Sequence, residues 1–114
     1  MEKIVEQTLL YDFYGELLTE HQKAIYEDVV FNDLSLSEVA QMQGISRQGV
    51  HDLIRRCDKI LAGYENKLHL IARFRETKQS VEEMYQMMEK YAKSKDETLM
   101  VKVTELYHRV LEEI

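Results

Sequence analysis

The chain has 114 residues, of which 45% are hydrophobic and 32% are charged, and its formal net charge is −6. This length and this hydrophobic content allow one domain with a real core, which argues against a disordered chain. There is no proline and there are only four glycines, and no segment alternates in the manner of a half-buried strand. The fold class that we expect is therefore all-α.

No apolar stretch approaches the roughly 20 residues that a membrane-spanning helix needs, and the opening MEKIVEQ is not a signal peptide. We therefore expect a cytoplasmic protein without membrane insertion. The single cysteine, Cys57, has no second cysteine with which to form an internal disulfide. Its place on an apolar helix stripe predicts a buried core residue rather than a reactive thiol.

Two helices are predicted in the N-terminal third. Apolar residues at helical spacing begin the first helix near Ile4, and it ends within 15–18. Thr19 and Gln22 form a capping box that opens the second helix, which ends at 32–33. This second helix is expected to brace the motif that follows.

Residues 36–55 have the spacing of a helix-turn-helix, in which two short helices cross at a steep angle. Ala40 is the small residue at the crossing, and Gly44 occupies the turn, where a positive φ costs little without a Cβ. A capping box at 35–38 opens the first helix, and Ser46 can cap the second. The stripe of the second helix that is expected to be buried consists of Val50, Leu53, Ile54, Cys57 and Leu61.

The opposite face of this second helix presents polar side chains that suit a nucleic-acid groove. Arginine can pair bidentately with guanine and glutamine with adenine, and the Ser46 hydroxyl can contact a phosphate. The face consists of Arg47, Gln48, His51, Asp52 and Arg55. A helix-turn-helix that serves only as a scaffold, with this face solvated or docked on protein, is the alternative.

The charge is unevenly distributed along the chain. Residues 1–34 carry eight acids and two bases (−6), residues 35–62 carry three acids and four bases (+1), and the rest carries ten acids and nine bases (−1). The basic excess therefore lies on the motif. Because it is small, we expect modest and salt-sensitive affinity for DNA.

After the motif, apolar residues continue at alternating steps of three and four through Ile71, so the second helix of the motif runs on or bends at Gly63. The polar segment 75–80 predicts a break there. New helices then follow the capping boxes at 80–83 and 94–97. Five or six helices result, with a helix-turn-helix domain at 1–62 and a C-terminal helical extension at 63–114.

The extension has more apolar stripe than a small bundle can bury, and its methionines suit an adaptable contact surface. They are Met84, Met87, Met88 and Met100. A homodimer is one interpretation, because helix-turn-helix proteins commonly read paired half-sites as dimers. Packing within the chain against residues 64–74 is the other.

The sequence offers no catalytic residue, metal site or cofactor site. The four histidines are scattered and none has a ligand spacing with Cys57. No glycine-rich phosphate loop is present, and the acidic pairs at 82–83 and 112–113 are typical of solvated helix faces. We therefore predict that the protein is not an enzyme.

The stretch 18–61, LTEHQKAIYEDVVFNDLSLSEVAQMQGISRQGVHDLIRRCDKIL, resembles region 4 of bacterial sigma factors, the helix-turn-helix that contacts the promoter −35 element. The resemblance implies a motif without a wing. It also implies base or phosphate contacts for Ser46, Arg47, Gln48, His51 and Arg55, and backbone contacts for Arg56 and Lys59. No segment resembles the sigma region that melts promoters, Gly49 weakens the reading helix, and the preceding helix is acidic, so we do not expect a sigma factor.

Over its full length, including LLYDFYGELLTEHQ near the start, the chain is similar to the YlxM family of small helix-turn-helix proteins in Gram-positive bacteria. That family is grouped with the signal recognition particle pathway because its gene lies beside those for the particle's protein and receptor. The resemblance implies a regulatory protein that takes part in this pathway.

Two functions remain open at this point. The first is a regulatory module that places its recognition helix in the major groove of duplex DNA. The alternative is an accessory factor that binds signal recognition particle RNA or the particle's GTPase protein. A-form RNA has a major groove too narrow for a helix, so RNA contact would use phosphates, a loop or an end.

Overall fold

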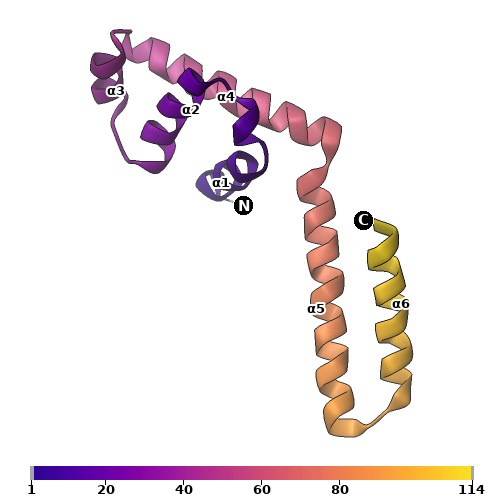
Figure 1. The fold of residues 1–114 in the computed structure, drawn as a ribbon. Helices are drawn as coiled ribbons and strands as arrows, with labels where there is room; N and C mark the ends of the chain where they lie inside the picture. The colour runs from indigo at the N-terminus through magenta and orange to yellow at the C-terminus, as the bar shows by residue number, and fades with distance from the viewer. Residues whose placement is uncertain (1, 114) are drawn as a thin grey trace. The chain divides into compact units, whose positions relative to one another are not determined.

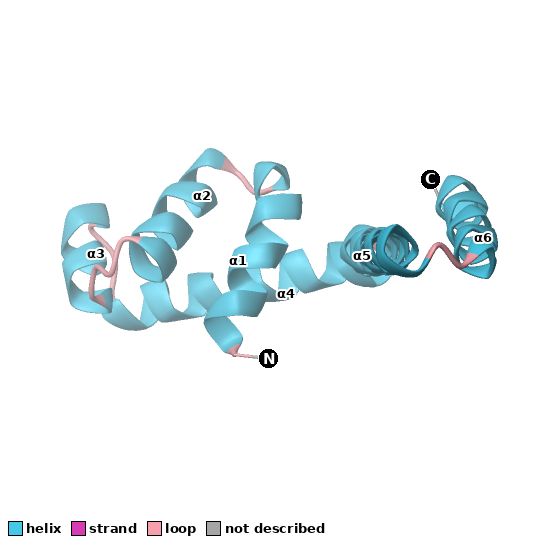
Figure 2. Cartoon of the chain, turned by 90° about the horizontal axis from the view of Figure 1, so that it is seen from below, coloured by secondary structure: helices cyan, strands magenta, loops and turns pink. Residues whose placement is uncertain are grey.

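The computed structural model describes residues 2–113, which are helical apart from short turns and contain no strand. Figure 1 shows the order of the helices, and Figure 2 shows how short the loops between them are. Within this range there are six α-helices: α1 (Lys3–Tyr14), α2 (Glu20–Tyr26), α3 (Leu36–Gln43), α4 (Arg47–Leu68), α5 (Leu70–Ser94) and α6 (Glu97–Glu113). The prediction of an all-α helix-turn-helix fold is confirmed.

The helices form two compact units that divide between His69 and Leu70. The boundary expected after residue 62 lies inside α4, which passes through Gly63 without a break. The helix ends where His69 adopts the left-handed conformation, with φ of 56°. Of the two alternatives at Gly63, the structure shows the continuous helix.

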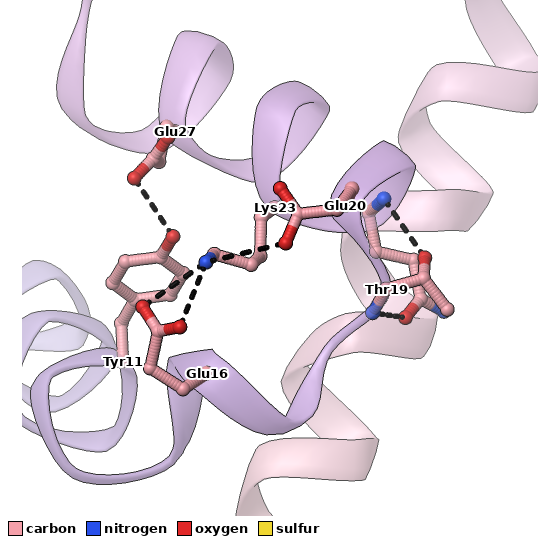
Figure 3. Close-up of polar contacts among 7 residues, drawn as sticks. Tyr11, Glu16, Thr19, Glu20, Lys23 and Glu27 are labelled. Carbon is pink, nitrogen blue, oxygen red and sulfur yellow. Dashed lines mark hydrogen bonds and ion pairs between the residues drawn. The ribbon is translucent and has the colours of Figure 1, made fainter.

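The first two helices begin and end as the sequence predicts. α1 ends at Tyr14 and a 3₁₀ turn follows at Gly15–Leu17. The Thr19 hydroxyl accepts a hydrogen bond from the backbone N–H of Gln22 at 3.1 Å, and the Gln22 side chain accepts one from the N–H of Thr19 at 3.0 Å (Figure 3). A π-helical turn at Glu27–Phe31 then completes α2.

The helix-turn-helix of α3 and α4 is held by the three predicted local signals. Ser35 and Glu38 form a reciprocal capping box at the start of α3. Gly44 ends α3 with φ of 67°, a conformation that a side chain would strain. The Ser46 hydroxyl accepts from the N–H of Gly49 at 2.9 Å and caps α4.

The core of this unit lies where α2, α3 and α4 meet. Ile25, Val39 and Val50 are fully buried, and Ala40 is small enough to let α3 approach its neighbours. Partly buried side chains surround them, namely Val29, Leu34, Leu36, Leu53 and Ile54. The apolar stripe predicted for α4 therefore faces inward.

Cys57 belongs to the same buried stripe. Its side chain is fully buried, and burial raises the pKa of its thiol to about 11. The thiol is therefore protonated and inert at neutral pH, as expected of a core cysteine.

Partly buried hydrogen bonds tie α4 to the two N-terminal helices. Asp58 of α4 accepts from the Tyr26 hydroxyl of α2 at 2.6 Å and from the Gln7 amide of α1 at 3.1 Å. The Tyr14 hydroxyl of α1 donates to Glu65, which lies near the C-terminal end of α4. Burial and the bond to Asp58 raise the pKa of Tyr26, so its hydroxyl stays protonated and keeps donating. These bonds fix the rotation of α4 about its axis.

In the C-terminal unit, α5 and α6 pack side by side as an antiparallel hairpin. The break predicted at 75–80 is wrong, because α5 is continuous from Leu70 to Ser94. Ser80 does not cap a helix: it is only 6% exposed and lies in the middle of α5. The polar run contains no glycine or proline, so nothing in it ends the helix, and its residues are distributed between the solvated side and the side that packs on α6.

The cap predicted at Ser94 is also misplaced. Ser94 is the last residue of α5, and Lys95 reverses the chain with φ of 57°. Asp96 caps α6 instead, since its Oδ1 accepts from the N–H of Thr98 at 3.0 Å and from its hydroxyl at 2.7 Å. These bonds lower the pKa of Asp96.

Among the described residues, no helix is both long and apolar enough to cross a membrane.

Replacement of Asp58 by alanine should lower the free energy of unfolding by about 2–3 kcal/mol, because the buried Tyr26 hydroxyl and the Gln7 amide lose their acceptor. Urea denaturation followed by circular dichroism measures the loss. Asp52→Ala, on the exposed face of the same helix, is the control and should change stability by less than about 0.5 kcal/mol. Equal effects of the two variants would show that Asp58 does not hold α4 in place.

Alanine at Gly44 and alanine at Gly63 should act on stability with opposite signs. Gly44→Ala should destabilise by about 1–2 kcal/mol, because its φ is positive. Gly63→Ala should stabilise by about 0.5–1 kcal/mol, since it lies within a helix and a Cβ there meets open space. Thermal unfolding of the two variants measures both effects, and destabilisation by Gly63→Ala would contradict the continuous α4.

Candidate nucleic-acid interface

The exposed face of α4 contains every side chain that the sequence predicted to bind nucleic acid. The buried stripe of Val50, Cys57 and Leu61 is in the core, so the opposite side of the helix points to solvent. Seven predicted residues are exposed on it or at its start: Ser46, Arg47, Gln48, His51, Arg55, Arg56 and Lys59. The structure therefore brings the predicted residues together on one surface.

The first turn of this face is organised by Ser46. Its oxygen accepts from the N–H of Gly49, while its hydroxyl hydrogen remains able to donate to a phosphate oxygen. A Cβ at residue 49 would lie 3.1 Å from the Ser46 oxygen. Glycine at this position thus leaves room for the Ser46 cap. This is a packing reason for Gly49, which from the sequence alone is expected only to weaken the helix.

An acidic residue lies in the middle of the face. The Gln48 amide donates to Asp52 Oδ1 at 2.9 Å, and His51 Nδ1 lies 3.8 Å from the same oxygen. Asp52 therefore occupies part of the hydrogen-bonding capacity of Gln48 and places a negative charge among the candidate base-reading groups. The spacing of four residues between Gln48 and Asp52 is the sequence signal from which this bond can be predicted.

The remaining basic side chains follow one turn further along. Arg55, Arg56 and Lys59 line an open concavity of about 320 Å³ together with Asp52. Three bases and one acid give this part of α4 a charge of +2. Guanidinium and ammonium groups on an exposed surface are the usual contacts to phosphates.

The charges on α1 and α2 differ from those on α4. Lys23 donates to both carboxylate oxygens of Glu16 at 3.0 Å and lies 3.8 Å from Glu20 (Figure 3). The hydrogen bond to Glu16 raises the pKa of Lys23. The Tyr11 hydroxyl donates to Glu27 at 2.8 Å. With three acids around one base, this surface repels a polyanion, whereas the face of α4 attracts one.

Residues 2–113 contain no group of three histidine, cysteine or acidic side chains that could hold a metal ion.

A family model described as "Putative helix-turn-helix protein, YlxM / p13 like", with the family name UPF0122, matches residues 1–105. This range includes all of α1 to α5 and the first part of α6. The match therefore concerns the whole helix-turn-helix unit and not the motif alone.

Relatives of similar length match most of the chain. A UPF0122 protein of Clostridium botulinum is 43% identical over 103 residues, which are 90% of this chain and 94% of the relative. A UPF0122 protein of a Thermoanaerobacter species is 37% identical over 107 residues, 94% of this chain and 92% of the relative. A third, from Caldanaerobacter subterraneus, is 46% identical over 77 residues, 68% of this chain and 66% of the relative. The chain therefore belongs to the UPF0122 family of YlxM- and p13-like helix-turn-helix proteins.

Proposed function

We propose that this protein is a regulatory module that binds duplex DNA through the exposed face of α4. The observation that carries the proposal is the position of Arg47, Gln48, His51 and Arg55 in the second helix of a helix-turn-helix, all exposed. In this fold the second helix enters the major groove with its N-terminal residues against base edges. Arg56 and Lys59 are assigned to phosphates.

The dimensions of the face suit a groove. From Arg47 to Arg55 the helix rises about 12 Å, which is similar to the width of the major groove in B-DNA. The later turns of α4 lie beyond this stretch and pack on α1 and α2, through Asp58 and Glu65 among others. Ser46, at the start of the helix, is placed for a phosphate at the edge of the groove.

The charges set an upper limit on affinity. Four bases act against Asp52 on the exposed face, and the chain as a whole has a charge of −6. Binding should therefore be modest and should weaken steeply as salt increases.

A second function is supported by the same charges. Asp52 in the middle of the face and the acidic surface of α1 and α2 both disfavour a duplex polyanion, which suits a protein partner or a few RNA phosphates better. The alternative that we propose is an accessory factor of the signal recognition particle, which binds its RNA or its GTPase protein. It follows from the resemblance of the sequence to the YlxM group.

Under both functions the protein acts by binding, with no catalytic step, metal or cofactor. Both ligands are cytoplasmic in bacteria, so we propose that location. We also propose that the chain forms a homodimer, which would present two α4 helices to paired half-sites. The surface for this dimer lies in the C-terminal unit.

The two functions are separated by titration into fluorescently labelled ligands at low and at physiological salt. One ligand is signal recognition particle RNA and the other is a pool of duplexes from the same genome. Preference for particular duplexes supports the DNA-binding function, and preference for the RNA supports the accessory function. Binding to neither ligand would contradict nucleic-acid binding by α4.

Arg55→Ala should weaken binding to the preferred duplex by roughly 5- to 100-fold, because one bidentate base contact contributes about 1–3 kcal/mol. Fluorescence anisotropy measures the change. Lys67→Ala removes an exposed base from the same helix beyond the proposed groove, and it should leave the affinity within about twofold. Equal affinities for the wild type and Arg55→Ala would remove Arg55 from the interface.

Asp52→Asn should strengthen duplex binding about fivefold, because a charge near 4 Å from a phosphate opposes binding by about 1 kcal/mol in water. The gain should shrink at high salt. Asp12→Asn makes the same change in net charge on the exposed side of α1 and should have no comparable effect. Weaker duplex binding by Asp52→Asn would instead identify Asp52 as a direct contact to a base.

A further inference from the structure

The hairpin of α5 and α6 leaves two apolar stripes exposed. On α5 the stripe consists of Val81, Tyr85 and Met88, and on α6 it consists of Met100, Tyr107 and Leu111. These six side chains are between 38% and 62% exposed. They carry no charge, and we refer to them together as the hairpin face.

Helix geometry places both stripes on the same side of the hairpin. On α5, Ser80, Met84 and Met87 are buried or half-buried toward α6, and the stripe lies about 100° around the helix from them. On α6, Val103 and Leu106 are buried toward α5, and its stripe also lies about 100° away. Each rotation follows the direction of its own helix. Because the two helices run antiparallel, the rotations have opposite senses when both are viewed from the same end of the hairpin. The two stripes therefore lie on the same side of the hairpin and form one continuous surface.

The other side of the hairpin is polar, which confirms this assignment of the faces. A concavity of about 200 Å³ on that side is lined by Glu76, Gln79, Ser80, Glu83, Arg109 and Glu113. The Thr77 hydroxyl also reaches Glu113 at 3.4 Å, near the open end of the hairpin. The hairpin as a whole is therefore amphipathic, with one solvated side and one apolar side.

The hairpin has little core of its own. In the described part of α5 and α6, four side chains are less than 10% exposed, although the two helices have 25 and 17 residues: Ile71, Ser80, Val103 and Leu106. A unit of this size with so few buried apolar residues does not usually hold two long helices together without further burial. The hairpin face is the apolar surface that a binding partner could bury.

We propose that the hairpin face binds the same face of a second copy, so that two hairpins form a four-helix bundle. The six side chains are between 38% and 62% exposed and form an apolar patch comparable with the largest that a monomer leaves open, about 300–600 Å², while a standard interface buries ~800 Å² on each partner. Antiparallel helix pairs commonly close their apolar sides in this way. The inference deepens the homodimer of the proposed function by assigning its surface, and it does not depend on nucleic-acid binding, because it rests on α5 and α6 alone.

The charges beside the face fit a second copy in particular. Lys78 and Glu89 are exposed on the same edge of the α5 stripe, 11 residues and about three turns apart. A twofold axis near residue 84 brings Lys78 of one copy to Glu89 of the other, and the reverse pair forms at the same time. Such self-complementarity is what an interface between identical surfaces requires.

Light scattering after size exclusion should give twice the 13.6 kDa of one chain, and the melting temperature should rise with protein concentration. Tyr107→Glu should shift the protein to the monomer mass, because it places a charge in the apolar face. Val101→Glu is the matched control: Val101 is exposed on α6 away from the face, and this variant should remain a dimer. A wild type that is monomeric up to submillimolar concentration overturns the proposal, as does a dimer that Tyr107→Glu does not weaken.

A charge exchange between two exposed side chains of α5 tests the interface. Lys78→Glu should weaken the dimer about fivefold, because it places like charges together at two symmetric positions. Lys78→Glu combined with Glu89→Lys should restore the affinity, which only a contact between copies explains. Failure of the double variant to recover dimer affinity would contradict the proposed pairing of α5 with its counterpart.

Discussion

The hydrogen bonds that Asp58 accepts from Tyr26 and Gln7 are the constraint on which the N-terminal unit depends. Apolar packing has no direction, so a buried stripe alone tolerates small rotations of a helix. Two donors from two other helices that meet on one carboxylate do not tolerate them. With Asp58 held in this way, the residues of α4 that lie opposite the core point outward. The same bonds that stabilise the fold thus decide which side chains a ligand meets.

The outward face of α4 carries basic side chains that attract a polyanion and one acidic side chain that opposes this attraction. Arg47, Arg55, Arg56 and Lys59 supply positive charge, while Asp52 holds the Gln48 amide and adds a negative charge among them. Under the proposed function, a face of this kind gains little from phosphates alone, so binding depends on a few well-placed contacts. Weak binding to non-specific DNA suits the proposed regulatory function, because the many non-specific sites of a genome then sequester less of the protein.

The helix-turn-helix unit was largely predictable from the sequence, because its signals are local. The capping boxes at Thr19 and Ser35, the left-handed Gly44 and the cap at Ser46 each depend on residues within one turn of one another. The buried stripe of α4 follows from helical periodicity alone. The bond from Tyr26 to Asp58 joins residues 32 positions apart, and no local pattern marks it.

The C-terminal unit was predicted less well for a physical reason. Ser80 with Glu83 has the pattern of a capping box, but a cap forms only where the chain leaves the helix, and packing on α6 keeps α5 continuous there. At the true turn, Asp96 takes the cap that the pattern assigned to Ser94, because Lys95 reverses the chain first. Local patterns identify residues able to cap, while tertiary contacts decide which of them do so. The sequence predicted the candidate site residues as a set on one helix face, and their role in binding stays a prediction.

NMR titration of the isotope-labelled chain with its preferred duplex tests the central claim most directly. The account predicts that backbone amide signals shift at residues 46–59, most strongly in the first turns of α4, while the signals of α5 and α6 stay in place. Shifts confined to α5 and α6, or to the acidic surface of α1 and α2, would contradict it.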